Sequence, residues 1–341
     1  MNRRAAKLVA PRKFEMIEEP IRPLLDGEVL LRVLSCGLCH SDFPAYRGES
    51  RIARTADGIP YMDTNLPYPF EVGHEPSGVV EDVGKAVKGL KPGDRVSGLA
   101  RGVFATHAYA DSGLLIKIPE EVKDLKYCLI EPLTCIANNL RAANPEYGDS
   151  VAVIGCGMMG LMAVAGLSRS SAREVIAVDL LDSRLEWAGK MGATKTLNPK
   201  KTDLGAETKE ITGGRGVDVV IEFTGKIAAL ELACDIVRPA VPVGFEGRGK
   251  ILIPSLYAGK QSFESSLGYK LMFKSPILHS THPWYSSDYR EDQRRALWGF
   301  IRGIFPLREI ITHEFPLQET QKAFEIAETG LDGYVKGIVL P

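Results

Sequence analysis

The stretch VAVIGCGMMG, residues Val151–Gly160, decides the fold that we predict for this chain. An apolar run of β-strand type leads directly into Gly155, Gly157 and Gly160, and the apolar segment Leu161–Leu167 follows at once. In this spacing the first glycine permits a tight turn, the second lets the backbone approach a pyrophosphate, and the third allows close helix packing. The stretch therefore predicts the strand, turn and helix of a dinucleotide-binding unit.

The residues around this turn favour NAD. Met158 and Met159 complete the turn, where the helix N-terminus is expected to face phosphate charge. Asp179 stands at the end of the next apolar strand, where a carboxylate can accept hydrogen bonds from an adenosine ribose and repels a 2′-phosphate. The alternative for Asp179 is an ordinary solvated acid at a strand end. Arg173 and Arg184 are the residues that would suit NADP, and Arg184 is included in the expected coenzyme site.

The chain from residue 149 onward alternates strands with helical segments. Val151–Ile154, Glu174–Val178 and Val217–Glu222 are apolar runs typical of buried parallel strands, and amphipathic segments such as Ser183–Met191 separate them. This alternation predicts a doubly wound α/β sheet.

The first part of the chain has a different pattern, with short β-branched runs such as Glu28–Leu34 and Ser77–Val83 between Gly- and Pro-rich turns. This pattern predicts a β-barrel. The predicted domains are therefore a barrel segment over residues 1–143, a coenzyme domain over residues 144–282, and a tail, residues 283–341. The tail is too short for a domain of its own, so we expect it to return to the barrel.

Composition limits the possible partners. The chain has 341 residues, of which 45% are hydrophobic and 25% charged, with a net charge of -1, so there is no basic footprint for nucleic acid or an anionic membrane. No apolar run approaches the roughly 20 residues that span a bilayer, and Met1–Ala10 lacks a signal-peptide pattern. Six scattered cysteines do not form a disulfide framework. We expect a cytoplasmic protein that acts on a small molecule.

A second motif predicts a metal site. Cys36 and Cys39 precede His74 and Glu75, and the latter pair follows a glycine, so thiol, imidazole and carboxylate become available together. These are ligands that zinc accepts. Cys36 is better explained as a small buried hydrophobic residue than as a ligand. A metal beside a nicotinamide coenzyme indicates hydride transfer.

Several motifs together resemble the zinc-dependent medium-chain dehydrogenase/reductase family, which includes the alcohol dehydrogenases. They are Cys39–Asp42, Gly73–Val96, Gly155–Gly160 and Phe223–Gly225, in this order and spacing. Ile130–Leu133 is most similar to the branch that contains sorbitol and other polyol dehydrogenases and threonine dehydrogenase. The resemblance implies a GroES-like β-barrel catalytic domain, a Rossmann coenzyme domain, and a catalytic zinc in the cleft between them.

The resemblance also implies roles for single residues. Cys39 matches the family's thiolate ligand and His74 its imidazole ligand. The third ligand is left open between Glu75 and Glu131, either of which can bind the metal directly or through water. Asp42 matches a carboxylate that orients the ligating imidazole.

Further residues match positions that handle protons and coenzyme. Ser41 matches the hydroxyl that contacts the substrate oxygen and passes its proton outward, whereas Pro44 stands where several members place a histidine that completes this path. Thr224 belongs to the expected coenzyme site. His40 and Lys336 match positions that can contact a coenzyme phosphate, and the alternative for each is a solvated surface residue.

These expectations lead to a zinc-dependent enzyme that transfers hydride between NAD and a secondary alcohol or ketone of a polyol, sugar or cyclitol. The alternatives are a simple alcohol or amino-alcohol (threonine-like) dehydrogenase and, from another class, a zinc-free nucleotide-binding or structural member. Ser97–Ala110 lacks the four cysteines that hold a structural zinc in many members, so we expect one catalytic zinc. By analogy we expect a homo-oligomer, a dimer or tetramer, and a polar loop at Glu49–Pro69.

Overall fold

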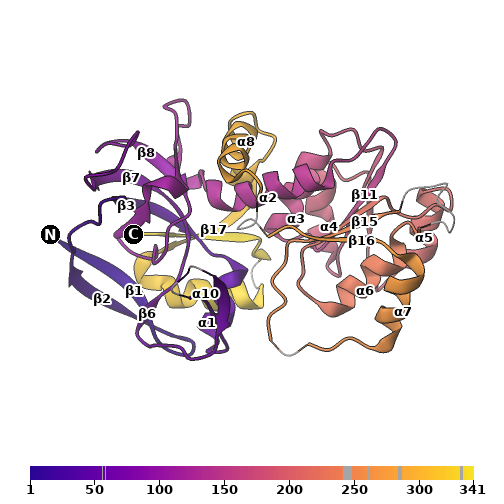
Figure 1. Cartoon of the computed structure of the whole chain (residues 1–341), viewed down its shortest axis with the longest axis horizontal. Coiled ribbons are helices and arrows are strands. Elements are labelled where there is room, and N and C mark those ends of the chain that lie inside the picture. Colours follow the sequence, from indigo (N-terminus) through magenta and orange to yellow (C-terminus); the bar gives the residue numbers. More distant parts are fainter. Residues whose placement is uncertain (56, 58, 241–247, 260, 283–285, 331–332) are drawn as a thin grey trace. The chain divides into compact units, whose positions relative to one another are not determined.

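The chain forms two units in the computed structural model (Figure 1). Residues 133–306 form one unit, and the two segments that flank them together form the other. The structure describes residues 1–341 except 56, 58, 241–247, 260, 283–285 and 331–332. The first unit comprises Met1–Pro132 and Leu307–Pro341, and the second comprises Leu133–Pro306. The chain thus leaves the first unit and returns to it. The units divide after Pro132 and before Leu307, whereas the predicted coenzyme domain spans residues 144–282.

The shifted divisions have a physical cause in two helices. Most of α2 (Ile130–Ala143) and all of α8 (Tyr289–Ile301) belong to the second unit. Arg141 on α2 donates from Nη2 to Asp292 Oδ2 on α8 at 2.8 Å, and Asp292 is fully buried. A buried carboxylate needs such a partner, so the two helices stay together.

Strand β11 (Ser150–Ile154) lies inside a six-stranded parallel sheet of the second unit, in the order β13-β12-β11-β14-β15-β16. All its residues are buried, which explains the continuous apolar sequence. This strand order is that of a doubly wound dinucleotide-binding fold, and the predicted fold class is confirmed. The other strands are β12 (Glu174–Val178), β13 (Lys195–Leu197), β14 (Val219–Glu222), β15 (Lys250–Ile253) and β16 (Ile277–Ser280).

Helices connect these strands. Helix α3 (Met158–Leu167) starts immediately after Gly157 and buries almost all of its side chains, as expected of an apolar helix packed on the sheet. The remaining connecting helices are α4 (Asp182–Lys190), α5 (Leu204–Ile211), α6 (Ile227–Ile236) and α7 (Ser265–Lys274).

The first unit is built from antiparallel strands around a second core. Its larger sheet has seven strands in the order β10-β8-β7-β3-β18-β17, with β9 paired to β3. This unit is the GroES-like part of the predicted fold. Its larger sheet contains β3 (Glu28–Gly37), β7 (Glu75–Val83), β8 (Arg95–Gly98), β9 (His107–Asp111), β10 (Leu115–Lys117), β17 (Ile311–Pro316) and β18 (Lys336–Leu340). A three-stranded sheet contains β1 (Asn2–Ala10), β2 (Lys13–Pro20) and β6 (Phe70–Glu71).

Aromatic side chains close this core. Phe324, on helix α10 (Thr320–Thr329), contacts the rings of Phe43, Tyr46 and Phe104 at centroid distances of 5.2, 5.0 and 5.5 Å. Phe43 and Tyr46 are the first and last residues of the short helix α1 (Phe43–Tyr46). The other α-helix of this unit among the described residues is α9 (Leu307–Ile310). The C-terminal segment therefore supplies core residues to the first unit.

The segment predicted as a loop, Glu49–Pro69, contains a hairpin. Strands β4 (Arg51–Arg54) and β5 (Pro60–Asp63) pair antiparallel, and Arg51 Nη2 lies 3.0 Å from Asp63 Oδ2. The cross-strand charge pair contributes to the stability of this strand pair. No helix in the described part of the chain combines the length and apolar character needed to cross a membrane.

Candidate metal centre and coenzyme site

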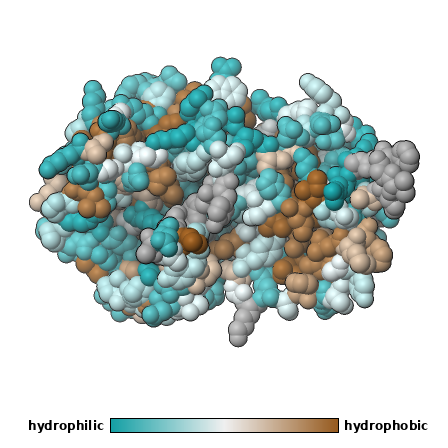
Figure 2. Space-filling model, in the orientation of Figure 1, coloured by the Kyte–Doolittle hydropathy of each residue, from teal (hydrophilic) through white to brown (hydrophobic). Residues whose placement is uncertain are grey.

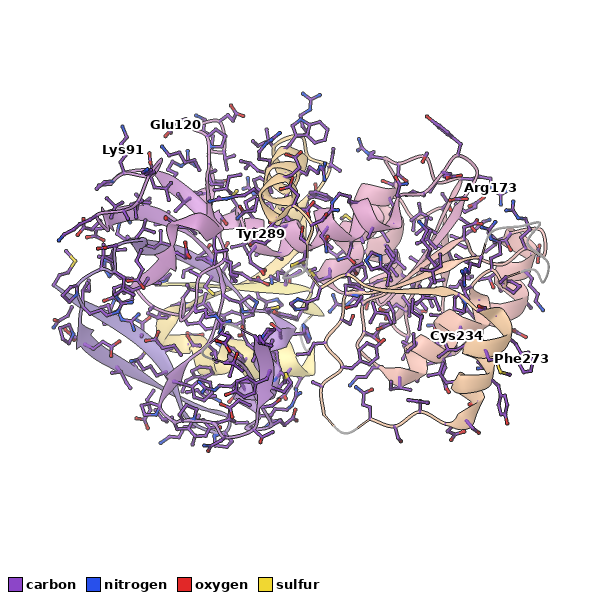
Figure 3. All side chains as sticks on the ribbon, viewed as in Figure 1. Lys91, Glu120, Arg173, Cys234, Phe273 and Tyr289 are labelled. Atoms are coloured by element: carbon purple, nitrogen blue, oxygen red, sulfur yellow. The ribbon has the colours of Figure 1, made fainter. Side chains whose placement is uncertain are left out.

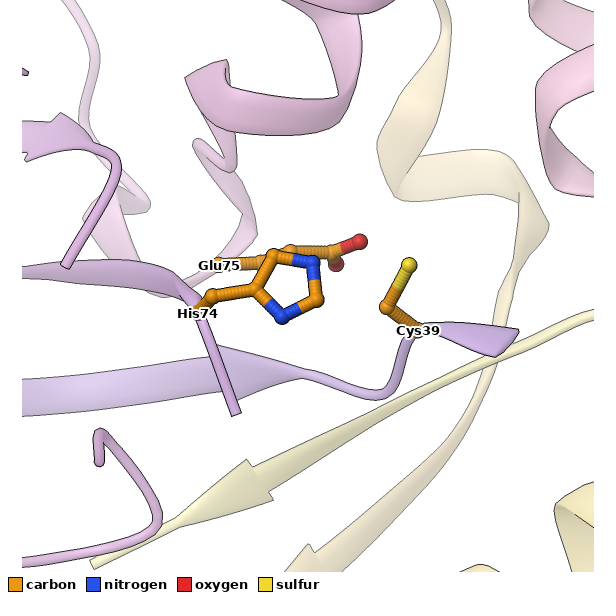
Figure 4. Close-up of side chains that lie close together, drawn as sticks. All are labelled: Cys39, His74 and Glu75. Carbon is orange, nitrogen blue, oxygen red and sulfur yellow. The ribbon is translucent and has the colours of Figure 1, made fainter. Parts of the chain in front are cut away.

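Pairing of β3 with β7 brings the predicted metal ligands together. Gly37 at the end of β3 lies opposite Glu75, the first residue of β7, so Cys39 and His74 lie just beyond the paired ends. One ligand atom from each of Cys39, His74 and Glu75 lies within 4.8 Å of the others (Figure 4). Gly37 makes this possible, because a Cβ there would lie 2.0 Å from Glu75 Oε2.

Neighbouring polar groups orient the imidazole and the thiol. Asp42 Oδ1 lies 3.3 Å from His74 Nδ1 and also accepts a hydrogen bond from the Gly73 backbone at 3.3 Å. Ser41 Oγ lies 3.4 Å from His74 Nε2 and donates to Cys39 Sγ at 3.3 Å. With Nδ1 turned to a carboxylate, Nε2 is the nitrogen available to a metal, as in histidine ligands generally.

The electrostatic surroundings favour a cation at this place. Burial lowers the pKa of His74, but the negative charges of Asp42 and Cys39 outweigh burial and raise it well above its ordinary value. A thiolate, an imidazole and a carboxylate satisfy the ligand preferences of Zn²⁺. The residues present therefore fit a zinc ion.

Glu131 adjoins this group without being one of its three members. It is 8% exposed at the start of α2. Burial raises its pKa to about 7, an effect to which the charge of Glu75 adds and which that of His74 opposes. These interactions place Glu131 in the electrostatic field of the candidate metal ligands.

Lys336 takes a place that sequence analysis missed. It is 3% exposed, and its Nζ donates to Glu75 Oε2 at 2.5 Å and to the Leu38 carbonyl at 2.8 Å. Burial lowers the pKa of Lys336, but the charges of Glu75 and Cys39 outweigh burial and raise it. The ammonium group expected on a coenzyme phosphate thus pairs with a candidate metal ligand. No local sequence signal indicates this pair, because it depends on the burial of Glu75, which only the fold shows, and a buried carboxylate needs a cation or donors.

His40, the other residue expected on a coenzyme phosphate, is exposed. Its ring stacks on Phe43 with a centroid distance of 5.1 Å. Pro44 is buried within α1.

The glycine turn of the second unit has the geometry that its sequence predicts. Gly155 has a φ of 92°, and a Cβ on Gly160 would lie 1.9 Å from the Gly155 carbonyl oxygen. A Cβ on Gly157 would meet nothing within 4 Å, so the second glycine faces open space. This is the arrangement that lets backbone N–H groups approach a pyrophosphate at the start of a helix.

Asp179 and Thr224 adjoin this turn. Asp179 accepts hydrogen bonds from the backbone N–H of Cys156 at 2.7 Å and of Leu181 at 2.9 Å. Thr224 Cγ2 lies 2.7 Å from the position of a Cβ on Gly155. Burial and the charge of Asp179 raise the pKa of the Cys156 thiol, whereas the charge of Arg184 lowers it, so Arg184 also acts at the turn. The predicted coenzyme residues Gly155, Gly157, Met158, Met159, Gly160, Asp179, Arg184 and Thr224 all belong to the second unit.

Comparison with known proteins identifies the class. The alcohol dehydrogenase GroES-like domain matches residues 25–120, and the zinc-binding dehydrogenase domain matches residues 159–275. (R,R)-butanediol dehydrogenase of Bacillus subtilis (strain 168) is 31% identical over 308 residues, which cover 81% of this chain and 87% of the relative. L-threonine 3-dehydrogenase of Pyrococcus abyssi is 29% identical over 354 residues, with 94% of each chain covered.

A solved structure agrees with these sequence matches. The crystal structure of 2R,3R-butanediol dehydrogenase from Bacillus subtilis covers 99% of both chains, with a TM-score of 0.81 and 25% identity. The chain belongs to the zinc-dependent medium-chain dehydrogenase family, and the resemblance seen in the sequence is confirmed. Membership implies a zinc ion, a nicotinamide coenzyme and oxidoreductase chemistry on CH–OH groups.

Proposed function

We propose that this protein is a zinc-dependent dehydrogenase that uses NAD and acts on a secondary alcohol of a polyol, sugar or cyclitol, or on the corresponding ketone. The observation that carries the proposal is the convergence of Cys39, His74 and Glu75 within 4.8 Å, with Asp42 orienting the imidazole. A zinc-free nucleotide-binding or structural protein has no physical need for such a ligand set.

Cys39 Sγ and His74 Nε2 would hold the zinc, with Glu75 as the third ligand. Its membership of the convergent group supports Glu75 over Glu131, although Lys336 competes for its carboxylate. When bound, zinc acts as a Lewis acid that lowers the pKa of a substrate hydroxyl.

Ser41 would take the hydroxyl proton at Oγ. Its distances to Cys39 Sγ and His74 Nε2, 3.3 and 3.4 Å, support this role. Pro44 has no side-chain donor or acceptor, so water or the coenzyme ribose would continue the path.

One zinc per subunit is proposed, because the cysteines of the usual structural-zinc lobe are missing from Ser97–Ala110. Asp179 supports NAD over NADP, since a carboxylate fixed on the glycine turn repels a 2′-phosphate. The charge of Arg184 beside the same turn is the feature that favours NADP.

The relatives support a small polar substrate. Butanediol and threonine each carry a second polar group beside the reacting hydroxyl, as polyols and sugars do. The second candidate substrate is a simple alcohol or a threonine-like amino alcohol. The similarity to L-threonine 3-dehydrogenase favours the amino alcohol.

The experiment is a substrate screen with NAD and with NADP, following the absorbance of the reduced coenzyme. Polyols, sugars and cyclitols are compared with 2,3-butanediol, L-threonine and simple alcohols. Turnover confined to simple alcohols or L-threonine would contradict the proposed substrate class, and a preference for NADP would contradict the proposed coenzyme.

Zinc analysis tests the metal. Cys39→Ser should lose both bound zinc and turnover, whereas the matched control Cys234→Ser, a buried thiol on α6 labelled in Figure 3, should keep both. Glu75→Gln should lower zinc retention more than Glu131→Gln. A wild-type protein without stoichiometric zinc would favour the zinc-free alternative.

We further propose a cytoplasmic homo-oligomer. None of the six cysteines, each within the described residues, is joined in a disulfide, as suits a reducing compartment. Strand β16 ends the described sheet, and its residues, including Ile277 and Leu278, are exposed. Figure 2 shows apolar surface over α6 and α7, and Phe273, labelled in Figure 3 on α7, is 74% exposed. An exposed strand edge beside apolar surface supports pairing with a second copy.

A further inference from the structure

Glu222, the last residue of β14, is a buried carboxylate that the proposed chemistry does not use. Its exposed fraction is 0%. Oε1 accepts hydrogen bonds from the backbone N–H and the hydroxyl of Thr224, both at 2.5 Å, and Oε2 accepts one from the Gly225 backbone at 3.1 Å. Within the described part of the chain no lysine or arginine forms an ion pair with it, so hydrogen-bond donors alone stabilise its charge.

Tyr257 supplies a further donor from a distant segment. Its hydroxyl donates to Glu222 Oε2 at 2.6 Å. Burial and this hydrogen bond both raise the pKa of Tyr257, which keeps the hydroxyl protonated and able to donate. Tyr257, in the segment that follows β15, therefore helps to fix the position of the Glu222 carboxylate.

Other bonds hold the same chain segment to the same turn. Ser255 Oγ donates to the Glu222 carbonyl at 2.7 Å. Gln261 Nε2 donates to the Gly225 carbonyl at 2.9 Å, and Gln261 Oε1 accepts from the Ile227 backbone at 3.0 Å. Residues 255–261, of which 260 is not described, thus contact the turn at several points on each side of Thr224.

The orientation of Thr224 matters because of what its methyl group touches. Two bonds to Glu222 Oε1 fix the backbone and the hydroxyl of Thr224, and thereby the direction of Cγ2. That methyl group lies 2.7 Å from the position of a Cβ on Gly155, the first glycine of the coenzyme turn. The neighbouring Phe223 backbone donates to the carbonyl of Ile154, directly before this glycine, at 2.8 Å.

We propose that Glu222 and Tyr257 are positioning residues for the nicotinamide coenzyme: they hold Thr224 against Gly155 and so set the shape of the glycine turn for binding. The inference rests on the proposed use of this turn by the coenzyme. Neither side chain contacts the coenzyme in this role, and both act through Thr224. Loss of a hydrogen bond at Glu222 lets the glycine turn adopt other conformations. The affinity for the coenzyme then falls in proportion to the fraction of molecules that keep the binding-competent conformation.

The test compares Glu222→Gln and Tyr257→Phe with a matched control, Asp218→Asn. Asp218 is also a buried carboxylate, 7% exposed, and it accepts from the Ser150 backbone and hydroxyl, each at 2.9 Å. It directly precedes β14, at the opposite end of the strand from Glu222. Coenzymes bind at the carboxyl ends of such sheets, so the control removes a comparable charge far from the turn.

Three readouts are taken on the zinc-loaded protein: the Kd of NADH from fluorescence titration, the Tm, and the zinc content. Each test variant should raise the Kd of NADH by up to roughly fivefold, because losing one typical hydrogen bond changes the equilibrium between shapes of the turn by that factor. The double variant should do little more than Glu222→Gln alone, because both changes break the same contact. Zinc content should stay unchanged, and Asp218→Asn should lower the Tm while leaving the Kd of NADH at the wild-type value.

The inference is overturned if both test variants lower the Tm as Asp218→Asn does but bind NADH as the wild type does, since Glu222 would then be purely structural. If Glu222→Gln fails to fold, Tyr257→Phe decides alone, because it removes only one hydroxyl. A wild-type protein that binds neither NADH nor NADPH would refute both the proposed function and this inference. Equal NADH binding by the wild type and all variants would refute only the inference.

Discussion

Replacement of Lys336 by methionine should destabilise the first unit strongly. The Lys336 and Glu75 side chains are 4% and 1% exposed, with 2.5 Å between Nζ and Oε2. At this separation the gross attraction is about 7 kcal/mol with an effective dielectric constant of about 20. Desolvation offsets much of this in the intact pair, but removing one partner leaves an uncompensated buried charge, which costs about 3–5 kcal/mol.

A surface pair in the same unit provides the control. Lys126 Nζ lies 2.9 Å from Glu314 Oε2, but these side chains are 37% and 35% exposed. Water screens such a pair, so Lys126→Met should cost less than about 1 kcal/mol. The two variants make the same chemical change and differ chiefly in the burial of the pair.

The assay is urea unfolding of zinc-free protein, in which no metal cation compensates Glu75, followed by far-ultraviolet circular dichroism, with zinc content measured to verify its removal. Glu75→Gln and the double variant complete a double-mutant cycle, in which the double variant should be more stable than the sum of the single losses predicts. If Lys336→Met is as stable as Lys126→Met, the reasoning that the buried pair is coupled would be refuted. Additive losses in the cycle would refute it equally.

Three further predictions concern other parts of the molecule. Asp42→Asn should weaken zinc binding by roughly 10–100-fold, measured by competition with a chelator, because the amide orients the His74 ring less well than a carboxylate does; unchanged affinity would argue against that orienting contact. Gly155→Ala should lower the Tm and NADH binding together, because φ is 92° and the added Cβ would meet the Thr224 methyl group; an alanine variant that binds NADH normally would show that the turn tolerates a side chain. Leu278→Lys should lower the molar mass measured by light scattering, because it places a charge on the exposed edge strand β16 of each subunit. An unchanged molar mass would show that this edge is not an oligomer contact.

Local sequence pattern was sufficient wherever a short segment determines its own conformation. The glycine spacing of residues 155–160 predicted the turn, because the φ of 92° at Gly155 and the lack of room for a Cβ at Gly160 demand glycine at these two positions. Apolar runs predicted β11 and β12, because strands buried on both faces require them. Boundaries were less predictable: the expected strand Glu28–Leu34 continues to Gly37, where pairing with β7 and β18 extends it.

The division into units depended on contacts that no local pattern contains. Sequence pattern places helix α8 in the returning tail, yet its buried Asp292 pairs with Arg141, which precedes it by 151 positions. The hairpin within Glu49–Pro69 likewise depends on a cross-strand pair, which a composition rich in Arg, Asp and Pro does not indicate.

By itself, the sequence determined the fold class, the family and the set of residues from which we propose a zinc site, because glycine turns, buried strands and ligand side chains are encoded in short segments. Only the tertiary structure decided what surrounds those residues. Lys336 reaches Glu75 across 261 positions of sequence, and Tyr257 reaches Glu222 across 35. A buried carboxylate must find a cation or donors somewhere in the fold, but which one it finds depends on the packing of distant strands.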